Sequence, residues 1–265
     1  MTELKKKVDR LSQEGKTGLS FFLTGGYPDM EGFAESVRYI DKNNLADFIE
    51  VGIPFSDPVA DGPVIQRSSR AAIESGSTYN RIMTTVKSLK KDIDIPLVLM
   101  TYLNILMAGG LKETLAKADR AGFSAVIIPD MPYGEHEEVS GILKELGMEL
   151  ILLVSPVTTG ARIREIAGVS SPFLYYVSSY GVTGRGKKFS KKTLKKIEQV
   201  KKISSKPVYC GFGISSPEDA EFIARAADGE IIGSAVVELL KDKKLPAAFK
   251  DIYKFAINIG KSIRR

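Results

Sequence analysis

Residues 48–63 read FIEVGIPFSDPVADGP and contain one strand and loop of the kind from which the fold is built. The first five residues are apolar except Glu50, which is typical of a short strand buried in a parallel sheet. The eleven residues that follow hold three prolines and two aspartates, which predicts a stiff loop before the next helix. The same order of strand, loop and amphipathic helix recurs through the chain, and this indicates βαβ units.

Eight strands are expected, at residues 19–24, 47–52, 97–101, 125–128, 149–154, 173–178, 207–211 and 230–233. Helices are expected at residues 30–43, 111–121, 135–146, 217–226 and 247–259, and an opening helix carries Leu4, Val8 and Leu11 on one face. Eight units favour a closed barrel over an open doubly wound sheet, and the first turn, TGGYP at 24–28, lacks a dinucleotide fingerprint. We therefore expect an α/β protein, with residues 1–265 forming a single (β/α)8 TIM barrel that has an extra N-terminal helix.

Composition suits one soluble globular domain, with 43% hydrophobic and 26% charged residues in 265. No apolar run approaches the roughly 20 residues that a membrane-spanning helix needs, and the N-terminus, MTELKKK, lacks the apolar core of a secretory signal. The one cysteine, Cys210, cannot form a disulfide within the chain, and the one histidine, His136, cannot build a Cys/His metal cluster. We expect a cytoplasmic protein with no metal site and no membrane contact.

The net charge of +6 raises the possibility of an acidic partner such as nucleic acid. Lys191, Lys192, Lys195 and Lys196, however, repeat at helical spacing opposite an apolar face. No aromatic residues that could stack on bases are interleaved with them. A solvated helix face is therefore favoured over nucleic-acid binding, and a phosphorylated substrate would suit a basic protein equally well.

Two carboxylates, Glu50 and Asp61, are expected at the C-terminal mouth of the second strand, where barrel enzymes place their sites. A pair of acids in different environments can supply both a proton donor and a proton acceptor. Each residue also has a structural alternative: a buried ion pair for Glu50, and the N-cap of the next helix for Asp61. For Asp57, before a proline, turn formation is the strong alternative.

Glycine segments follow the last two expected strands, GFGISS at 211–216 and GSAV at 233–236. Glycines let backbone amides approach an anion, and these loops are the habitual phosphate site of barrels; the alternative is that they serve only as turns. A third segment, GVTGRGKK at 181–188, half-matches a P-loop but places Lys188 where a Ser or Thr must bind magnesium. A glycine-hinged lid over the barrel mouth is the better interpretation.

Residues 50–63 resemble the signature stretch of the tryptophan synthase alpha-subunit family, and GVTG at 181–184 and GFGIS at 211–215 resemble two further family segments in the same order. The resemblance implies a carbon–carbon lyase of tryptophan biosynthesis that cleaves indole-3-glycerol phosphate into indole and glyceraldehyde 3-phosphate. Glu50 would protonate indole C3 and then handle the glycerol hydroxyl proton. Asp61 would accept or stabilise the indole N–H proton, so that the bond breaks in a retro-aldol step.

The resemblance also implies a binding site and a partner. The substrate-binding positions are Phe22, Met100, Tyr175, Thr183 and Phe212, the phosphate-binding positions are Gly184, Gly213, Gly233 and Ser234, and the partner-contacting positions are Pro54, Phe55 and Asp57. The family works as an alpha2-beta2 heterotetramer whose beta subunit holds pyridoxal phosphate, so no cofactor is expected in this chain. The alternatives are a stand-alone indole-releasing lyase, a catalytically idle activator of a beta subunit, and another phosphate-binding barrel. The presence of both carboxylates argues against the idle activator.

Overall fold

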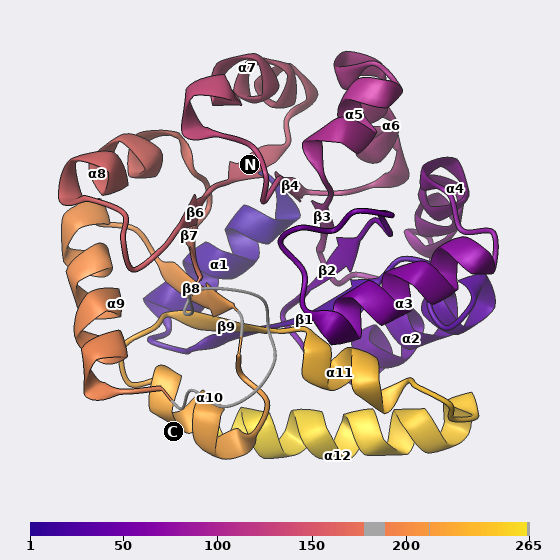
Figure 1. Cartoon of the computed structure of the whole chain (residues 1–265). Helices are drawn as coiled ribbons and strands as arrows, with labels where there is room; N and C mark the ends of the chain where they lie inside the picture. The colour runs from indigo at the N-terminus through magenta and orange to yellow at the C-terminus, as the bar shows by residue number, and fades with distance from the viewer. Residues whose placement is uncertain (178–188, 212, 264–265) are drawn as a thin grey trace.

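Short parallel strands pair in one sheet around which the helices are arranged (Figure 1). The computed structural model describes residues 1–177, 189–211 and 213–263. Within them the strand order is β5-β4-β3-β2-β1-β9-β8-β7-β6. The strands are β1 Gly18–Thr24, β2 Phe48–Gly52, β3 Leu97–Met100, β4 Ala125–Ile127, β5 Glu149–Ile151, β6 Leu153–Val154, β7 Leu174–Val177, β8 Val208–Gly211 and β9 Gly229–Ile232.

The sheet closes into a barrel because β5 and β6 are two halves of one strand. β5 pairs with β4 on one side, and β6 pairs with β7 on the other. The expected strand 149–154 is interrupted at Leu152, whose backbone N–H donates to the hydroxyl of Ser170 at 3.0 Å instead of joining the ladder. The predicted TIM barrel is confirmed, with one strand divided in two.

The barrel interior is filled at its N-terminal end, so the opposite end is left for a site. The N-terminal helix α1, Glu3–Gln13, places Leu4 and Val8 in the interior cluster. Above them the ring of Phe173 stacks on that of Tyr209 with 4.3 Å between centroids. Aromatic pairs of this kind contribute about 0.5–1.5 kcal/mol beyond the area they bury. The extra N-terminal helix is therefore a plug for the bottom of the barrel.

The other helices surround the strands, and most of them pack there through one large apolar cluster. They are α2 Met30–Lys42, α3 Pro63–Glu74, α4 Tyr79–Leu89, α5 Leu103–Ala108, α6 Leu111–Ala121, η1 Tyr133–Glu135, α7 His136–Leu146, α8 Gly160–Val169, α9 Lys191–Ser204, α10 Pro217–Ile223, α11 Ser234–Leu239 and α12 Leu245–Ile263. Ile65 of α3 belongs instead to the interior cluster. On α9, Lys191, Lys192 and Lys195 are exposed while Ile197 and Val200 are buried, as expected of a solvated face. No helix in the described part of the chain is long and apolar enough to cross a membrane.

Candidate active site

Glu50 lies in the middle of β2 and points into the barrel. Strand residues alternate between the two faces of a sheet, and Phe48, two residues earlier, belongs to the interior cluster. The Glu50 side chain is 0% exposed, and neither carboxyl oxygen has a hydrogen-bond partner among the described residues. The alternative of a buried ion pair is therefore wrong for this part of the chain. Because burial disfavours the charged form, it raises the pKa of Glu50 to about 8.

Asp61 ends the loop that follows β2 and does not cap the next helix. The N-cap of α3 is Gly62, and Pro63 occupies the first helical turn. The Asp61 carboxylate instead accepts a hydrogen bond from the hydroxyl of Tyr102 at 3.0 Å. The helix-cap alternative is therefore wrong, and the side chain is directed to the cavity. Burial raises the pKa of Asp61 to about 6, against the opposing effect of the hydrogen bond from Tyr102.

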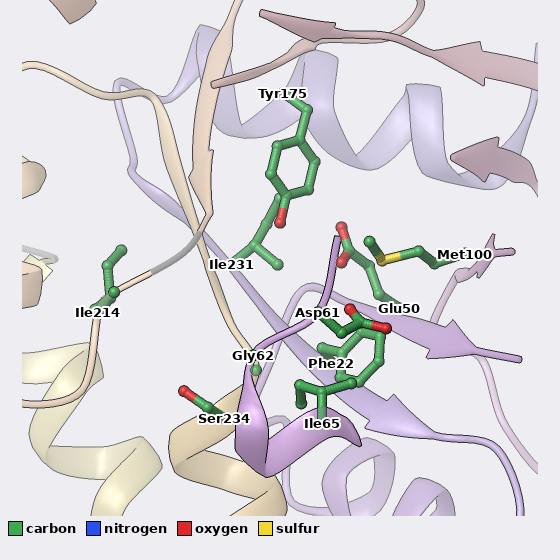
Figure 2. Close-up of a pocket in the computed structure, with 12 residues that line it drawn as sticks. Phe22, Glu50, Asp61, Gly62, Ile65, Met100, Tyr175, Ile214, Ile231 and Ser234 are labelled. Carbon is green, nitrogen blue, oxygen red and sulfur yellow. The ribbon is translucent and has the colours of Figure 1, made fainter. Parts of the chain in front are cut away.

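The two acids differ in protonation state at neutral pH. With a pKa of about 8, Glu50 is mainly protonated at pH 7 and can donate a proton. With a pKa of about 6, Asp61 is mainly ionised and can accept one. Figure 2 shows both carboxyl groups directed into the same cavity. Two acids whose environments separate their pKa values are the arrangement that assigns one as acid and the other as base.

The cavity at the barrel mouth brings together residues from six strands and their loops, and it encloses about 470 Å³ of space that includes its solvent-filled opening. It is lined by Phe22, Glu50, Asp61, Gly62, Ile65, Met100, Tyr175, Gly213, Ile214, Ile231, Gly233 and Ser234. Eight of these were singled out from the sequence. Gly62, Ile65, Ile214 and Ile231 were not. Ile231 could have been found, because it lies on the inward phase of β9, two residues before Gly233.

Three of the expected phosphate-binding residues line this cavity. Gly213 has φ of +91°, a left-handed conformation that favours glycine. Gly233 precedes α11, and Ser234 is the first residue of that helix. In Figure 2 the Ser234 side chain lies below the carboxylates, on the α11 side of the cavity. Backbone amides beside glycines and at helix starts are suited to an anion.

Comparison with known proteins agrees with this geometry. The sequence profile of a family described as "Tryptophan synthase alpha chain" matches residues 8–261. The chain belongs to the tryptophan synthase alpha chain family. Its curated relatives include the tryptophan synthase alpha chain of Petrotoga mobilis, which is 39% identical over 236 residues, 89% of this chain and 91% of the relative.

Solved structures of tryptophan synthases superpose on this chain over nearly its whole length. The tryptophan synthase alpha subunit of Legionella pneumophila superposes with a TM-score of 0.88 at 30% identity, covering 99% of this chain and 98% of that one. A tryptophan synthase from M. tuberculosis in an aminoacrylate-bound form gives a TM-score of 0.86 at 27% identity, covering 100% of both chains.

Several residues singled out by the family resemblance lie outside the described residues. They are Thr183 and Gly184, which belong to the expected lid at residues 181–188, and Phe212. The expected partner-contacting residues are described. Pro54 is buried, Phe55 is half-buried and Asp57 is exposed. Val59, in the same loop, is 79% exposed, so this loop presents apolar surface at the barrel mouth.

A second buried acid, Glu230, also has a raised pKa but is not among the residues that line the cavity. Glu230 is 0% exposed on β9, and burial raises its pKa to about 9. Its neighbour Ile231 lines the cavity, so the alternation of the strand turns Glu230 toward the outer layer of helices. Its partner across the ladder, Cys210, belongs to the outer cluster. Glu230 therefore resembles Glu50 in its burial and raised pKa, but its side chain does not line the cavity.

Proposed function

We propose that this chain cleaves indole-3-glycerol phosphate into indole and glyceraldehyde 3-phosphate, the alpha reaction of tryptophan synthesis, with Glu50 as the acid and Asp61 as the base. Family membership supports the reaction. The observation that supports the roles is the pair of buried carboxyl groups in one cavity, with pKa values of about 8 and about 6. Acid and base groups of this kind each contribute roughly 10²–10⁴ in rate.

The proposed chemistry proceeds in two stages. In the first, Asp61 takes the indole N–H proton while Glu50 protonates indole C3, and the ring becomes an indolenine. In the second, the Glu50 carboxylate takes the proton of the glycerol hydroxyl next to the reacting bond. The carbon–carbon bond then breaks, its electron pair passes to the indolenine ring, and Asp61 returns a proton to the ring nitrogen. The aldehyde and indole leave, and both carboxyl groups return to their starting protonation states.

The cavity walls fit the two ends of this substrate. Phe22, Ile65 and Met100 form an apolar surface around the carboxylates, which suits the indole ring. Gly213, Gly233 and Ser234 line the same cavity and are the residues that we expect to bind the phosphate. The Tyr175 hydroxyl points toward the centre of the cavity from β7 (Figure 2). The residues that line this one cavity can therefore account for ring binding, phosphate binding and proton transfer.

The direct test is the release of indole from purified protein and indole-3-glycerol phosphate, with and without a beta subunit. We expect indole in both conditions and a higher rate with the partner. Release that needs no partner and does not respond to one would favour a stand-alone lyase. No release in either condition, with a beta subunit that is nevertheless activated, would favour an idle activator.

Ser234→Asp should weaken substrate binding at least tenfold while leaving the fold intact. A carboxylate in the first turn of α11 repels a phosphate bound there, whereas an acidic residue at that position favours the helix itself. Calorimetric titration with glycerol phosphate measures the affinity, and circular dichroism reports the fold. An affinity equal to that of the wild type would place the phosphate elsewhere.

We also propose a beta subunit as partner, in an alpha2-beta2 heterotetramer located in the cytoplasm, with the pyridoxal phosphate held by that partner. Support comes from the related tryptophan synthase structure from M. tuberculosis, which is described as aminoacrylate-bound. On this chain, the loop that holds Pro54, Phe55 and Asp57 offers both apolar and charged surface next to the cavity. The same loop carries Asp61, so partner binding there would act directly on the proposed base.

Phe55→Ala should weaken association with a beta subunit about tenfold, because aromatic side chains at the centre of an interface often account for more than 1 kcal/mol of binding energy. The matched control is Tyr253→Ala on α12, which removes another surface aromatic, 43% exposed. Dissociation constants from calorimetry or sedimentation would test this. Equal affinities for the wild type and Phe55→Ala would remove Phe55 from the interface.

A further inference from the structure

Tyr102 is buried at the mouth of the barrel, and no sequence motif singles it out. It follows β3 by two residues and continues the inward phase of Val98 and Met100, which belong to the interior cluster. It therefore lies one level above Met100, nearer to the opening. The Tyr102 side chain is 4% exposed, so a polar atom there needs a partner within the protein.

Tyr102 contacts the loop between β2 and α3, residues 53–62, near both of its ends. Its hydroxyl donates to the Asp61 carboxylate at 3.0 Å and accepts from the backbone N–H of Ala60 at 3.1 Å. Its ring packs against that of Phe55, with 5.0 Å between centroids and 30° between planes. One buried side chain thus touches both the proposed base and the proposed partner-contacting aromatic.

We propose that Tyr102 is a positioning residue that fixes the Asp61 carboxylate at the cavity mouth and connects it to Phe55. The inference rests on the proposed role of Asp61 as the base. The backbone N–H of Ala60 orients the hydroxyl by donating to one of its lone pairs, so that the hydroxyl proton is directed to Asp61. A displacement of the Phe55 ring would move the Tyr102 ring, and with it the donor on which Asp61 depends.

This arrangement has a consequence for proton transfer. A hydrogen bond to a carboxylate favours its ionised form, so the Tyr102 hydroxyl lowers the pKa of Asp61 against the effect of burial. Among the residues that the structure describes, the other titratable groups that line the cavity are Glu50 from β2 and Tyr175 from β7. Asp130 lies near Tyr102, and its carboxylate accepts from the backbone N–H of Leu103 at 2.9 Å. The Tyr102 hydroxyl donates to Asp61 at 3.0 Å and is therefore placed to set the ionisation of that carboxylate directly.

The first test is a carbon-13 NMR titration of the aspartate carboxyl groups in the wild type and in Tyr102→Phe. The Asp61 signal is assigned by its loss in Asp61→Asn. Tyr102→Phe keeps the ring that packs on Phe55 and removes only the donor, so the Asp61 pKa should rise by about one unit. The matched control is Tyr79→Phe, which removes a hydroxyl that donates to the backbone oxygen of Thr114 at 2.8 Å, between α4 and α6. It should leave the Asp61 titration unchanged.

The connection to Phe55 is tested by a double-mutant cycle. Phe55→Ala should raise the Asp61 pKa in the wild-type background, because the Tyr102 ring loses its packing. In the Tyr102→Phe background the same change should add no further shift. An equal shift in both backgrounds would overturn the connection, and an unchanged Asp61 titration in Tyr102→Phe would overturn the positioning role.

The NMR titration needs no substrate, so its outcome is separate from the proposed function. A shifted Asp61 titration in a wild-type protein that releases no indole would contradict the proposed reaction and support the role of Tyr102. In an active protein, the acid limb of kcat/KM should move with the NMR titration by the same amount. A general loss of structure in Tyr102→Phe would lower the rate without moving that limb, and this result would contradict positioning.

Discussion

Glu50→Gln should lose most turnover and at the same time become more resistant to unfolding. The loss of rate is expected because glutamine cannot donate or accept the proton at indole C3, and such groups are worth roughly 10²–10⁴ in rate. The amide has nearly the same shape as the protonated acid, so the cavity keeps its form. Loss of activity combined with a gain in stability would separate a catalytic role from a structural one.

The gain in stability follows from the direction of the pKa shift. In the unfolded chain Glu50 ionises near its ordinary pKa of 4.5, whereas in the fold its pKa is about 8. Below pH 4.5 both states are protonated, and the folded state incurs no penalty. Between pH 4.5 and pH 8 the unfolded state ionises first, so the free energy of unfolding falls as the pH rises. Glutamine does not ionise, and at pH 8 the variant should gain about 2–4 kcal/mol.

Glu230→Gln is the matched control for this prediction. Glu230 is equally buried, and its pKa is also raised, to about 9, but it faces the outer layer of helices. We expect a similar gain in stability at pH 8 with turnover close to that of the wild type. Denaturant unfolding and indole release would be measured on both variants. Near-normal turnover in folded Glu50→Gln would contradict the assignment of Glu50 as the acid.

Asp61→Asn should also lower turnover by roughly 10²–10⁴, for a different reason. Asparagine can still accept the hydrogen bond from Tyr102, so the loop should stay in place. It cannot take the proton from the indole nitrogen, so the indolenine does not form. Substrate affinity should change little, because the residues expected to bind the phosphate lie on other loops.

Asp242→Asn serves as the control for this second variant. Asp242 is remote from the proposed catalytic groups and has φ of +52°, a conformation that asparagine tolerates well. Fixed-time assays of indole release should give the wild-type rate for Asp242→Asn. A folded Asp61→Asn protein within a few fold of the wild-type rate would remove Asp61 from the chemistry.

The fold could be predicted from the sequence because each strand carries its own signal. Short apolar segments such as 48–52 alternate with amphipathic helices, and parallel pairing follows from that order. The break at Leu152 could not be predicted from local pattern. It depends on the hydroxyl of Ser170, which is 18 residues away in the sequence and adjacent only in the folded barrel.

Part of the candidate site could also be predicted from the sequence, since eight of the residues that line the cavity were selected from it. Glu50 and Asp61 could be selected as candidates because a carboxylate in an apolar strand and another in the following loop are expected near the barrel mouth, and both line the cavity there. Tyr102 was missed because its role depends on a hydrogen bond to a loop 41 residues away. Likewise, nothing local to Asp61 shows that Gly62, rather than Asp61, begins the next helix.

The most direct test of opposite roles for Glu50 and Asp61 is the pH dependence of kcat/KM for indole release, which reports the ionisations of the free enzyme. The expected profile is a bell with an acid limb near pH 6, where Asp61 becomes protonated, and an alkaline limb near pH 8, where Glu50 loses its proton. The residual activity of Asp61→Asn should lack the acid limb, and that of Glu50→Gln should lack the alkaline limb. A flat profile between pH 5 and pH 9, or the persistence of both limbs in either variant, would contradict the pairing of Glu50 as acid with Asp61 as base.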